Sequence, residues 1–499
     1  MTIRTSTTHP LQIAAVAAGV SVGAGVSKGA GAGAGRVGLT LCPGKKQPHA
    51  MTGGWDRDLQ LDLDTVEQWG TAALVSLIEA HELVNLGVPT LGDETNRRSM
   101  AWLHFSIADV STPGPKFEAS WAEHGEGLRA RLRDGFNVVV HCKGGLGRAG
   151  LVAAKLLSEL GQQPEEAISQ VRAVRPGAIE TSAQRNYVLA QRLVPERQPD
   201  RSADAIRNRA VGALVGLAVG DAVGTTLEFM ARDSYEPLVD IIGGGPFNMA
   251  AGEWTDDTSM ALALADSLIA NRELDAADLM KRFCAWRDEG QYSCGCRDIG
   301  MTVSGALSRW RRDGNAMAGS TDPDSAGNGS LMRLAPVALA HWNDLERLAD
   351  VASRQSRTTH GAAEAVAACV GFSMVLADAI AGKHRSIVMA PRPGAFAGKI
   401  AGIMAGSWRG LRRSEIHSSG YVAHSLEAAL WSVGRTADFR SAVLLAANLG
   451  GDADTTAAIA GQLAGALYGV GGISGPWLAK LAWRERIIDM ADRLVAPTL

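Results

Sequence analysis

Residues 141–148 read His-Cys-Lys-Gly-Gly-Leu-Gly-Arg, and they stand between a strand pattern and a helix pattern. The strand pattern is the apolar run NVVVH at 137–141, and the helix pattern covers 151–160. A cysteine at such a turn lies near the positive end of the helix and among backbone N–H groups, which favours its thiolate. Glycines let the loop curl so that these N–H groups converge on an anion. The stretch therefore predicts a phosphate-binding loop in an α/β domain.

Arg148 stands six positions after Cys142, so its planar guanidinium can return to the same centre and grip phosphate oxygens. A thiolate nucleophile, a cradle of N–H groups and an arginine are what phosphoryl transfer to cysteine requires. We therefore predict Cys142 as the nucleophile and Arg148 as the phosphate clamp. The loop residues expected to bind substrate are Lys143, Gly144, Gly145 and Gly147.

Two other interpretations of this loop remain open. Residues 145–150 also spell G-x-G-x-x-G, a dinucleotide-binding pattern when it lies between a strand and a helix. That kind of site needs an acidic residue at the end of the next strand, whereas Glu165 and Glu166 follow Pro164 at a helix start. A glycine turn made for structural reasons alone is the other alternative. Neither alternative requires Cys142.

The signature His-Cys-x5-Arg, extended to HCKGGLGRAGLVAA and followed by RPGAIETSAQRNY, resembles the protein tyrosine and dual-specificity phosphatases. The match is to the branch of the cyclin-dependent-kinase-inhibitor-associated phosphatase, and it covers residues 36–193. It implies a central, mainly parallel sheet flanked by helices, and no cofactor. A loop aspartate such as Asp109 is usually only a turn former, but the resemblance implies that Asp109 is the general acid. It also implies that Gln184 helps to place the hydrolytic water.

One position departs from the family pattern. Ser or Thr usually follows the arginine of the signature, where this chain has Ala149. In the family, that hydroxyl helps the sulfur to leave when the phospho-enzyme is hydrolysed. Its absence predicts a slower second step and leaves the chemistry unchanged.

A polar stretch with two prolines, VPERQPDRSA at 194–203, separates this half from a region of different residue pattern. We interpret 194–204 as a linker. From 205 to 495, small and aliphatic residues recur at helical spacing, as in AVGALVGLAVGDAV at 210–223. This pattern predicts one all-α domain in which glycine and alanine let helices approach closely.

Two acidic clusters open helical runs in this half, Thr-Asp-Asp-Thr at 255–258 and Asp-Ala-Asp-Thr-Thr at 452–456. Acidic residues at helix starts are ordinarily caps, and for either cluster alone a cap is the simpler interpretation. Carboxylates with hydroxyls, however, make a hard oxygen-donor site that suits Mg²⁺ or Mn²⁺ and does not suit zinc. We therefore predict that packed helices bring both clusters into one binuclear magnesium or manganese centre.

Together with GDAVG at 220–224, Asp-Ile-Gly at 298–300 and GNGSLMR at 327–333, these clusters resemble the ADP-ribosylglycohydrolase family, as in the dinitrogenase-reductase-activating glycohydrolase. The resemblance implies an all-α bundle with two metal ions in a central cleft, and hydrolysis of an ADP-ribosyl linkage. It implies that Glu228 and Asp298 assist acid–base chemistry. The implied metal ligands are Thr255, Asp256, Asp257, Asp452, Asp454 and Thr455. The implied substrate-binding residues are Asn328, Gly329, Ser330 and Tyr421. We interpret His360 as structural.

Composition bounds the remaining choices. The chain has 499 residues with 46% hydrophobic side chains, enough for two cores. A net charge of −3 argues against a protein that coats nucleic acid or anionic membrane. Six cysteines are too few for a disulfide scaffold, and the pair Cys294 and Cys296 lacks a second pair for a zinc finger. Finding no run of about 20 strongly apolar residues, we predict no membrane span.

The first 35 residues are rich in alanine and glycine. We expect a disordered tail over 1–35, with a signal peptide as the less favoured alternative, and we expect a cytoplasmic protein. The whole chain is therefore predicted to be a bifunctional hydrolase acting on phosphorylated and ADP-ribosylated substrates. Two alternatives remain. Either half serves only to bind its modified partner, or the second half hydrolyses another nucleoside glycoside.

Overall fold

The computed structural model describes residues 3–19, 33–50, 53–271, 273–295 and 298–499. Two compact units divide the chain, the first built on Met1–Arg197 and the second on Gln198–Trp408, Ile416–Gly434 and Asp438–Leu499. The division falls inside the stretch that we interpret as the linker. Cys296 of the C-x-C pair lies outside the described residues.

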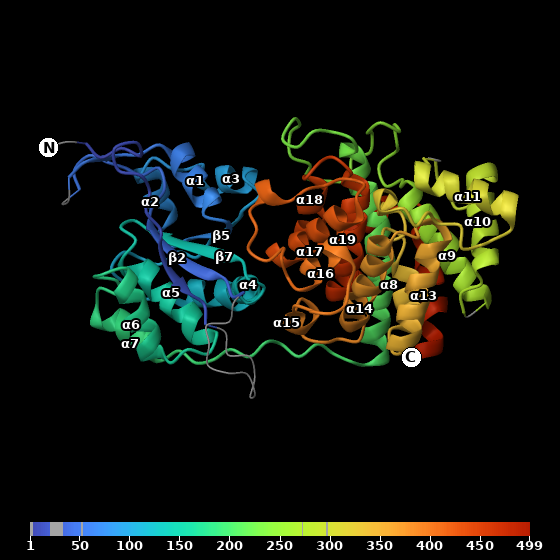
Figure 1. Cartoon of the computed structure of the whole chain (residues 1–499). Coiled ribbons are helices and arrows are strands. Elements are labelled where there is room, and N and C mark those ends of the chain that lie inside the picture. The colour runs from blue at the N-terminus through green and yellow to red at the C-terminus, as the bar shows by residue number, and fades with distance from the viewer. Residues whose placement is uncertain (1–2, 20–32, 51–52, 272, 296–297) are drawn as a thin grey trace. The chain divides into compact units, whose positions relative to one another are not determined.

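The first unit is built on a sheet with strand order β1-β2-β7-β5-β6 (Figure 1). Its strands are β1 (Ala14–Ala17), β2 (Arg36–Leu41), β5 (Thr71–Ser76), β6 (Ala101–His104) and β7 (Asn137–Cys142), and a separate ribbon pairs β3 (Lys46–Gln47) with β4 (Trp55–Asp56). The central strand β7 is parallel to β2 and β5, β5 is parallel to β6, and only β1 is antiparallel to its neighbour. All six residues of β7 are buried, as suits a β-branched run with helices on both faces.

Helices flank this sheet on both sides. They are α1 (Leu59–Gln68), α2 (Ala80–Asn85), α3 (Leu91–Arg97), α4 (Pro115–Arg133), α5 (Gly147–Glu159), α6 (Pro164–Val174) and α7 (Ser182–Leu189). Figure 1 shows α5, α6 and α7 on one side of the sheet and α1 and α3 on the other. The predicted fold class of this half is confirmed, with a mainly parallel sheet flanked by helices.

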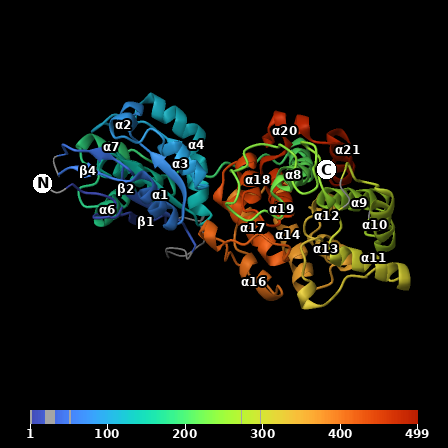
Figure 2. The same ribbon diagram turned by 90° about the horizontal axis from the view of Figure 1, so that it is seen from above.

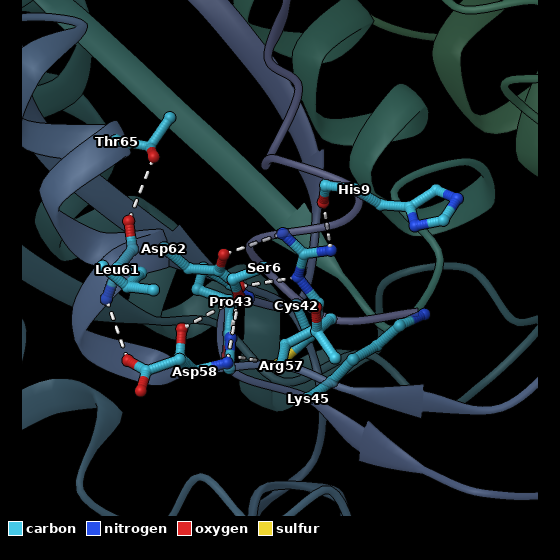
Figure 3. Close-up of polar contacts among 12 residues, drawn as sticks. Ser6, His9, Cys42, Pro43, Lys45, Arg57, Asp58, Leu61, Asp62 and Thr65 are labelled. Atoms are coloured by element: carbon cyan, nitrogen blue, oxygen red, sulfur yellow. Dashed lines mark hydrogen bonds and ion pairs between the residues drawn. The ribbon is translucent and has the colours of Figure 1, made fainter. Parts of the chain in front are cut away.

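The N-terminal segment belongs to the first unit. Ala14–Ala17 pairs with β2 along its whole length, so the prediction of a disordered tail is wrong there, while 20–32 lie outside the described residues. The guanidinium of Arg57 ties the segment down, donating to the carbonyl of His9 at 2.8 Å and to both carboxylate oxygens of Asp62 at 2.7 and 2.8 Å (Figure 3). Strand pairing uses backbone groups, so composition alone does not reveal it.

The second unit is all-α, as predicted. Its α-helices are α8 (Ala203–Gly224), α9 (Asp256–Asn271), α10 (Ala276–Glu289), α11 (Met301–Asp313), α12 (Ala335–His341), α13 (Leu345–Thr359), α14 (Ala363–Ile380), α15 (Arg385–Val388), α16 (Gly398–Met404), α17 (Val422–Arg435), α18 (Phe439–Ala447), α19 (Ala453–Tyr468), α20 (Gly475–Lys480) and α21 (Arg484–Val495). Helix α8 is apolar around its circumference and is surrounded by other helices, with α19 lying alongside it (Figures 1 and 2).

Glycines spaced four residues apart along α8 let α19 approach closely. A Cβ built on Gly220 would lie 2.1 Å from the carbonyl oxygen of Ala457, and one on Gly224 would lie 2.3 Å from that of Ala453. Only glycine fits positions where a neighbouring backbone comes so near. This contact places the end of α8 against the start of α19, where the second acidic cluster lies.

By length and composition alone, Ala203–Leu227 and Ala363–Ile380 are long and apolar enough to cross a membrane, although we predicted no such segment. Their apolar windows are 94% and 72% buried inside the structure. Core helices of a helical bundle have the same length and composition, so this is weak evidence for a span.

Candidate active sites

Cys142 ends the central strand of the first unit, and α5 begins five residues later at Gly147. The backbone N–H of Gly145 donates to its sulfur at 3.2 Å. Gly145 has φ +71°, and a Cβ there would lie 2.5 Å from the carbonyl oxygen of Thr40. The loop thus curls around the sulfur because glycine occupies its tightest position.

Arg148 is held over this loop by two carboxylates. Its Nη1 and Nη2 donate to the Glu82 oxygens at 2.6 and 3.0 Å, and Nη2 lies 2.9 Å from Oδ1 of Asp109. Burial alone would raise the pKa of Glu82, but the hydrogen bonds from Arg148 hold it below its ordinary value. The structure therefore brings together Cys142, Arg148 and the exposed Asp109, in positions that suit a nucleophile, a clamp and an acid.

A buried chain of polar groups supports the strand behind the cysteine. Nε2 of His141 lies 2.6 Å from Oγ of Ser76, which also accepts from Nε1 of Trp102 at 2.7 Å. Burial lowers the pKa of His141 to about 3, so the ring is neutral. The histidine of the signature is thus a structural residue that links the strands β5 and β7.

Gln184 lies at the edge of the same loop. Its side-chain atoms would be 3.1 Å from a Cβ on Gly147, and Nε2 donates to the carbonyl of Ser111 at 3.2 Å, on the segment that follows Asp109. Lys143 is half-buried and Gly144 is exposed. Ala149 is fully buried and offers no hydroxyl to the sulfur.

The two acidic clusters of the second unit meet around the start of α19. Carboxylate oxygens lie within 4.8 Å of one another in two sets, one of Asp221, Asp257 and Asp454 and the other of Glu228, Asp452 and Asp454. Asp454 is common to both sets, which is the arrangement expected of a carboxylate shared by two cations. Of the predicted ligands, Asp256 belongs to neither set, whereas Asp221 and Glu228 join the cluster.

The predicted threonine ligands lie among these carboxylates. Oγ1 of Thr255 is 3.3 Å from an oxygen of Asp257 and 3.3 Å from one of Asp454, and Oγ1 of Thr455 is 3.4 Å from Asp257. Asp221 accepts both the backbone N–H and the hydroxyl of Thr255, each at 2.9 Å. Asp221 therefore orients a predicted ligand and stands directly behind it.

The electrostatics of this cluster fit divalent cations. Burial and the charges of neighbouring carboxylates raise the pKa values of Asp257 and Asp454 well above the ordinary range. Oδ1 of Asp257 is buried and has no hydrogen-bond partner among the described residues. Buried carboxylates that face one another in this way need positive charge between them, and a hard oxygen-donor set suits Mg²⁺ or Mn²⁺.

The two predicted acid–base residues border this cluster. Oε2 of Glu228 accepts the backbone N–H of Ala453 at 2.8 Å, and burial raises the pKa of Glu228 to about 7. Asp298 is half-buried, and its charge contributes to the raised pKa of Asp256 and of Asp452. Both residues thus lie close enough for their charges to act on the cluster.

The predicted substrate loop reaches the cluster through Asn328. Its Nδ2 donates to Asp452 at 2.6 Å, and its backbone N–H donates to the carbonyl of Gly420 at 3.1 Å, which brings Tyr421 beside it. Ser330 is turned the other way, with its buried hydroxyl 2.9 Å from that of Ser356, so only its backbone is left to meet a ligand.

Gly329 packs on His360, the residue that we interpreted as structural. A Cβ on Gly329 would lie 2.7 Å from Cε1 of His360, so the imidazole packs directly against the predicted substrate loop. Burial lowers the pKa of His360 to about 3. The hydroxyl of Tyr421 donates to Glu364 at 2.5 Å, which fixes the orientation of the ring.

Two residues of these sites escaped the sequence analysis as functional groups. Glu82 lies far from the signature in sequence, and its only local signal is a capping box at the start of α2. Asp221 was recognised as part of a motif, but its position at a helix end gave no reason to place it behind Thr255. Both act by holding another residue.

Comparisons with known proteins confirm both resemblances. Residues 202–498 match the model of the ADP-ribosylglycohydrolase family, and 35–170 match that of cyclin-dependent kinase inhibitor 3. A 304-residue stretch is 43% identical to the ADP-ribosylarginine hydrolase Tri1 of Pseudomonas putida, covering 60% of this chain and 80% of that protein. A solved structure named an ADP-ribosylglycohydrolase-related protein complex is similar with a TM-score of 0.53 at 38% identity, over 59% of this chain and 99% of that one.

The first unit has its own relatives. It is 36% identical over 135 residues to human cyclin-dependent kinase inhibitor 3, covering 26% of this chain and 62% of that protein. The matched region includes Cys142, Arg148 and Asp109. Each unit therefore carries its own family likeness, and each likeness includes the cluster of side chains described above.

Proposed function

Because this chain belongs to the ADP-ribosylglycohydrolase family, we propose that its second unit removes ADP-ribose from arginine side chains of modified proteins. The observation that carries the proposal is the convergence of five carboxylates on the start of α19, one of them with an unpartnered buried oxygen. The identity of 43% to an ADP-ribosylarginine hydrolase favours arginine as the modified residue.

In this proposal Asp257, Asp452 and Asp454 would hold two divalent cations, with the hydroxyls of Thr255 and Thr455. Bound cations supply Lewis-acid chemistry to the ribose hydroxyls and to a water. Glu228 moves the proton, because its carboxyl lies within 4.8 Å of the carboxylates of Asp452 and Asp454 and so borders the reacting centre. Tyr421 and the backbone of 328–330 hold the rest of the ADP-ribose.

The test uses defined peptides carrying ADP-ribose on arginine or on serine, with and without a chelator. We expect release of ADP-ribose from the arginine peptide in Mg²⁺ or Mn²⁺ and none after chelation. Asp257→Asn should lose both this activity and tight binding of Mn²⁺, measured by electron paramagnetic resonance. Asp266→Asn is the matched control, because Asp266 stands on the same helix but pairs with Arg282. Release that survives chelation would refute the metal assignment.

For the first unit we propose hydrolysis of phosphate monoesters through a phospho-cysteine. The thiolate of Cys142 attacks phosphorus while the leaving oxygen takes the proton of Asp109. Arg148 and the loop N–H groups hold the equatorial oxygens. Water, placed by Gln184, then gives a proton to the Asp109 carboxylate and attacks phosphorus, which breaks the sulfur–phosphorus bond, releases phosphate and returns both the thiolate and the acid. The position of Asp109 beside Arg148 supports this assignment, because it places the carboxyl next to the loop that holds the sulfur of Cys142.

Steady-state hydrolysis of an aryl phosphate tests this half. Cys142→Ser should abolish turnover and keep tungstate binding. Arg148→Lys should also fail, because a point charge does not reproduce the planar fork. Appreciable turnover by Cys142→Ser would contradict the cysteine mechanism. The mechanism needs a reduced thiol, and Cys42, Cys142, Cys284, Cys294 and Cys369 are all free, so we also propose that the protein acts in the cytoplasm.

A further inference from the structure

We propose that Lys45 and Arg175 are positioning residues of the phosphate loop, which hold its carbonyl groups from outside so that its N–H groups face the sulfur of Cys142. The inference rests on the proposed role of this loop in binding phosphate. It adds two cations outside the loop, Lys45 and the arginine that opens RPGAIETSAQRNY, and both donate hydrogen bonds to the backbone of the loop. Neither belongs to the residues predicted from the sequence.

The contacts follow one another along the loop. Nζ of Lys45 donates to the carbonyl oxygen of Lys143 at 3.2 Å. Nη2 and Nε of Arg175 donate to the carbonyl oxygens of Gly144 and Gly145, each at 3.1 Å. Three consecutive carbonyls are therefore bound by cations on one side.

Because a peptide bond is planar, holding a carbonyl group in place also fixes the direction of the N–H group bonded to it. All peptide bonds here are trans, so the N–H of each next residue points away from the carbonyl before it. The N–H groups of Gly144, Gly145 and Leu146 consequently turn to the opposite side. The N–H of Gly145 does lie on the sulfur, at 3.2 Å, which is the orientation this reasoning requires. A cradle fixed in advance needs no reorganisation when an anion arrives.

Lys45 is unusual for a lysine because only 5% of its surface is exposed. Its ammonium lies 4.6 Å from the centre of the Trp55 ring and points away from the guanidinium of Arg57 (Figure 3). The groups with the largest electrostatic effect on it are Cys42, Arg57, Cys142 and Lys143, and no carboxylate of the described residues forms an ion pair with it. Burial lowers its pKa to about 8, so it is mostly charged at pH 7.

A buried cation without a carboxylate partner costs free energy, and a neutral side chain of the same length would avoid that cost. Its charge stays available to the loop because no carboxylate in the described part of the chain is paired with it. Because the charges of Lys45 and Cys142 act on each other, the ammonium favours the thiolate as well as an incoming phosphate. Lys45 therefore has two effects on the loop, orienting the peptide of Lys143 and contributing positive charge.

The test compares Lys45→Met, Lys45→Arg and Arg175→Met with Lys46→Met in the full chain. Lys46 is the matched control, because it is the exposed neighbour of Lys45 and pairs with Asp56. Two measurements are made on each folded variant. One is the pH dependence of alkylation of Cys142 by iodoacetamide, followed by peptide mass spectrometry. The other is the affinity for tungstate.

Lys45→Met should slow alkylation at pH 6 about tenfold, because it removes a positive charge that favours the thiolate. Its tungstate affinity, and that of Arg175→Met, should fall about tenfold, the usual effect of losing one charge-assisted contact. Lys45→Arg should recover most of the loss, and Lys46→Met should match the parent protein. If Lys45→Met does not fold, Arg175→Met carries the test.

Wild-type alkylation and tungstate binding in folded Lys45→Met and Arg175→Met would overturn the inference and leave only a structural role. Both measurements are independent of turnover. A chain that hydrolyses no phosphate ester but shows the expected shifts would therefore refute the proposed phosphatase activity and leave the positioning role standing.

Discussion

Replacing Gly220 by alanine tests whether the close approach of α8 and α19 builds the metal cluster. A Cβ at this position would lie 2.1 Å from the carbonyl oxygen of Ala457 and 2.9 Å from Cα of Ala458, whereas ordinary contact begins at 3.4 Å. The obstacle is backbone, so it cannot rotate away, and the two helices must separate by about 1.3 Å. Overpacking of this kind costs about 1–3 kcal/mol, and we expect the upper end of that range.

The same displacement acts on the site, because Asp221 follows Gly220 directly. Metal coordination tolerates deviations of only about 0.2 Å, so a shift of an ångström should weaken Mn²⁺ binding at least tenfold. Urea unfolding followed by circular dichroism measures the first effect, and electron paramagnetic resonance of Mn²⁺ measures the second. Gly402→Ala is the control, since Gly402 lies inside helix α16 and its Cβ would be 4.0 Å from the nearest atom, Oγ of Ser407. That substitution should stabilise the protein by about 0.5–1 kcal/mol.

Gly220→Ala with the stability and the Mn²⁺ affinity of the parent chain would refute the argument. The glycines along α8 would then permit the close approach of α19 without being required for it. A change in stability equal to that of Gly402→Ala would refute it equally, because the reasoning predicts opposite signs for the two substitutions.

Three further predictions concern the first unit. Ala149→Ser should raise steady-state turnover of an aryl phosphate, because the restored hydroxyl speeds breakdown of the phospho-cysteine. It should also remove the burst of product in rapid-quench kinetics, and an unchanged burst would point to another rate-limiting step. Arg57→Met should lower the free energy of unfolding by about 3–5 kcal/mol, since it leaves the buried Asp62 carboxylate unpaired and frees the carbonyl of His9; a change below about 1 kcal/mol would be inconsistent with that role. Burial holds the pKa of His141 at about 3, so the unfolded chain binds a proton that the folded unit excludes between about pH 6.5 and pH 3. Stability should therefore fall as pH drops through that window, and His141→Gln should flatten the dependence in urea titrations at pH 4 and pH 7.

The sequence predicts the parts of this molecule whose signals are local. The run NVVVH is β-branched and apolar, and it forms the central strand β7 because a strand covered on both faces needs such residues. The spacing of Cys142 and Arg148 in the loop at 141–148 is enough to predict a phosphate-binding loop. The residue types of the acidic clusters are enough to predict a site for hard metal ions. In these cases neighbours in sequence are neighbours in space.

The remaining features depend on contacts between distant residues. Ala14–Ala17 forms a strand through backbone hydrogen bonds to β2, which its side chains do not encode. Glu82 and Arg148 are brought together by the sheet, 66 residues apart in sequence. The buried orientation of the Ser330 hydroxyl follows from the packing of α13 beneath its loop. None of these placements can be deduced from composition or periodicity, because each requires the folded neighbours.

The central claim is that two chemically independent hydrolytic sites share this chain. The most direct test measures hydrolysis of an aryl phosphate and release of ADP-ribose from an arginine peptide on the same four samples, namely untreated protein, chelated protein, Asp454→Asn and Cys142→Ser. Our account predicts that chelation and Asp454→Asn each abolish release of ADP-ribose and spare the phosphatase, and that Cys142→Ser does the converse. Release of ADP-ribose that survives both chelation and Asp454→Asn, or loss of both activities in Cys142→Ser, would contradict it.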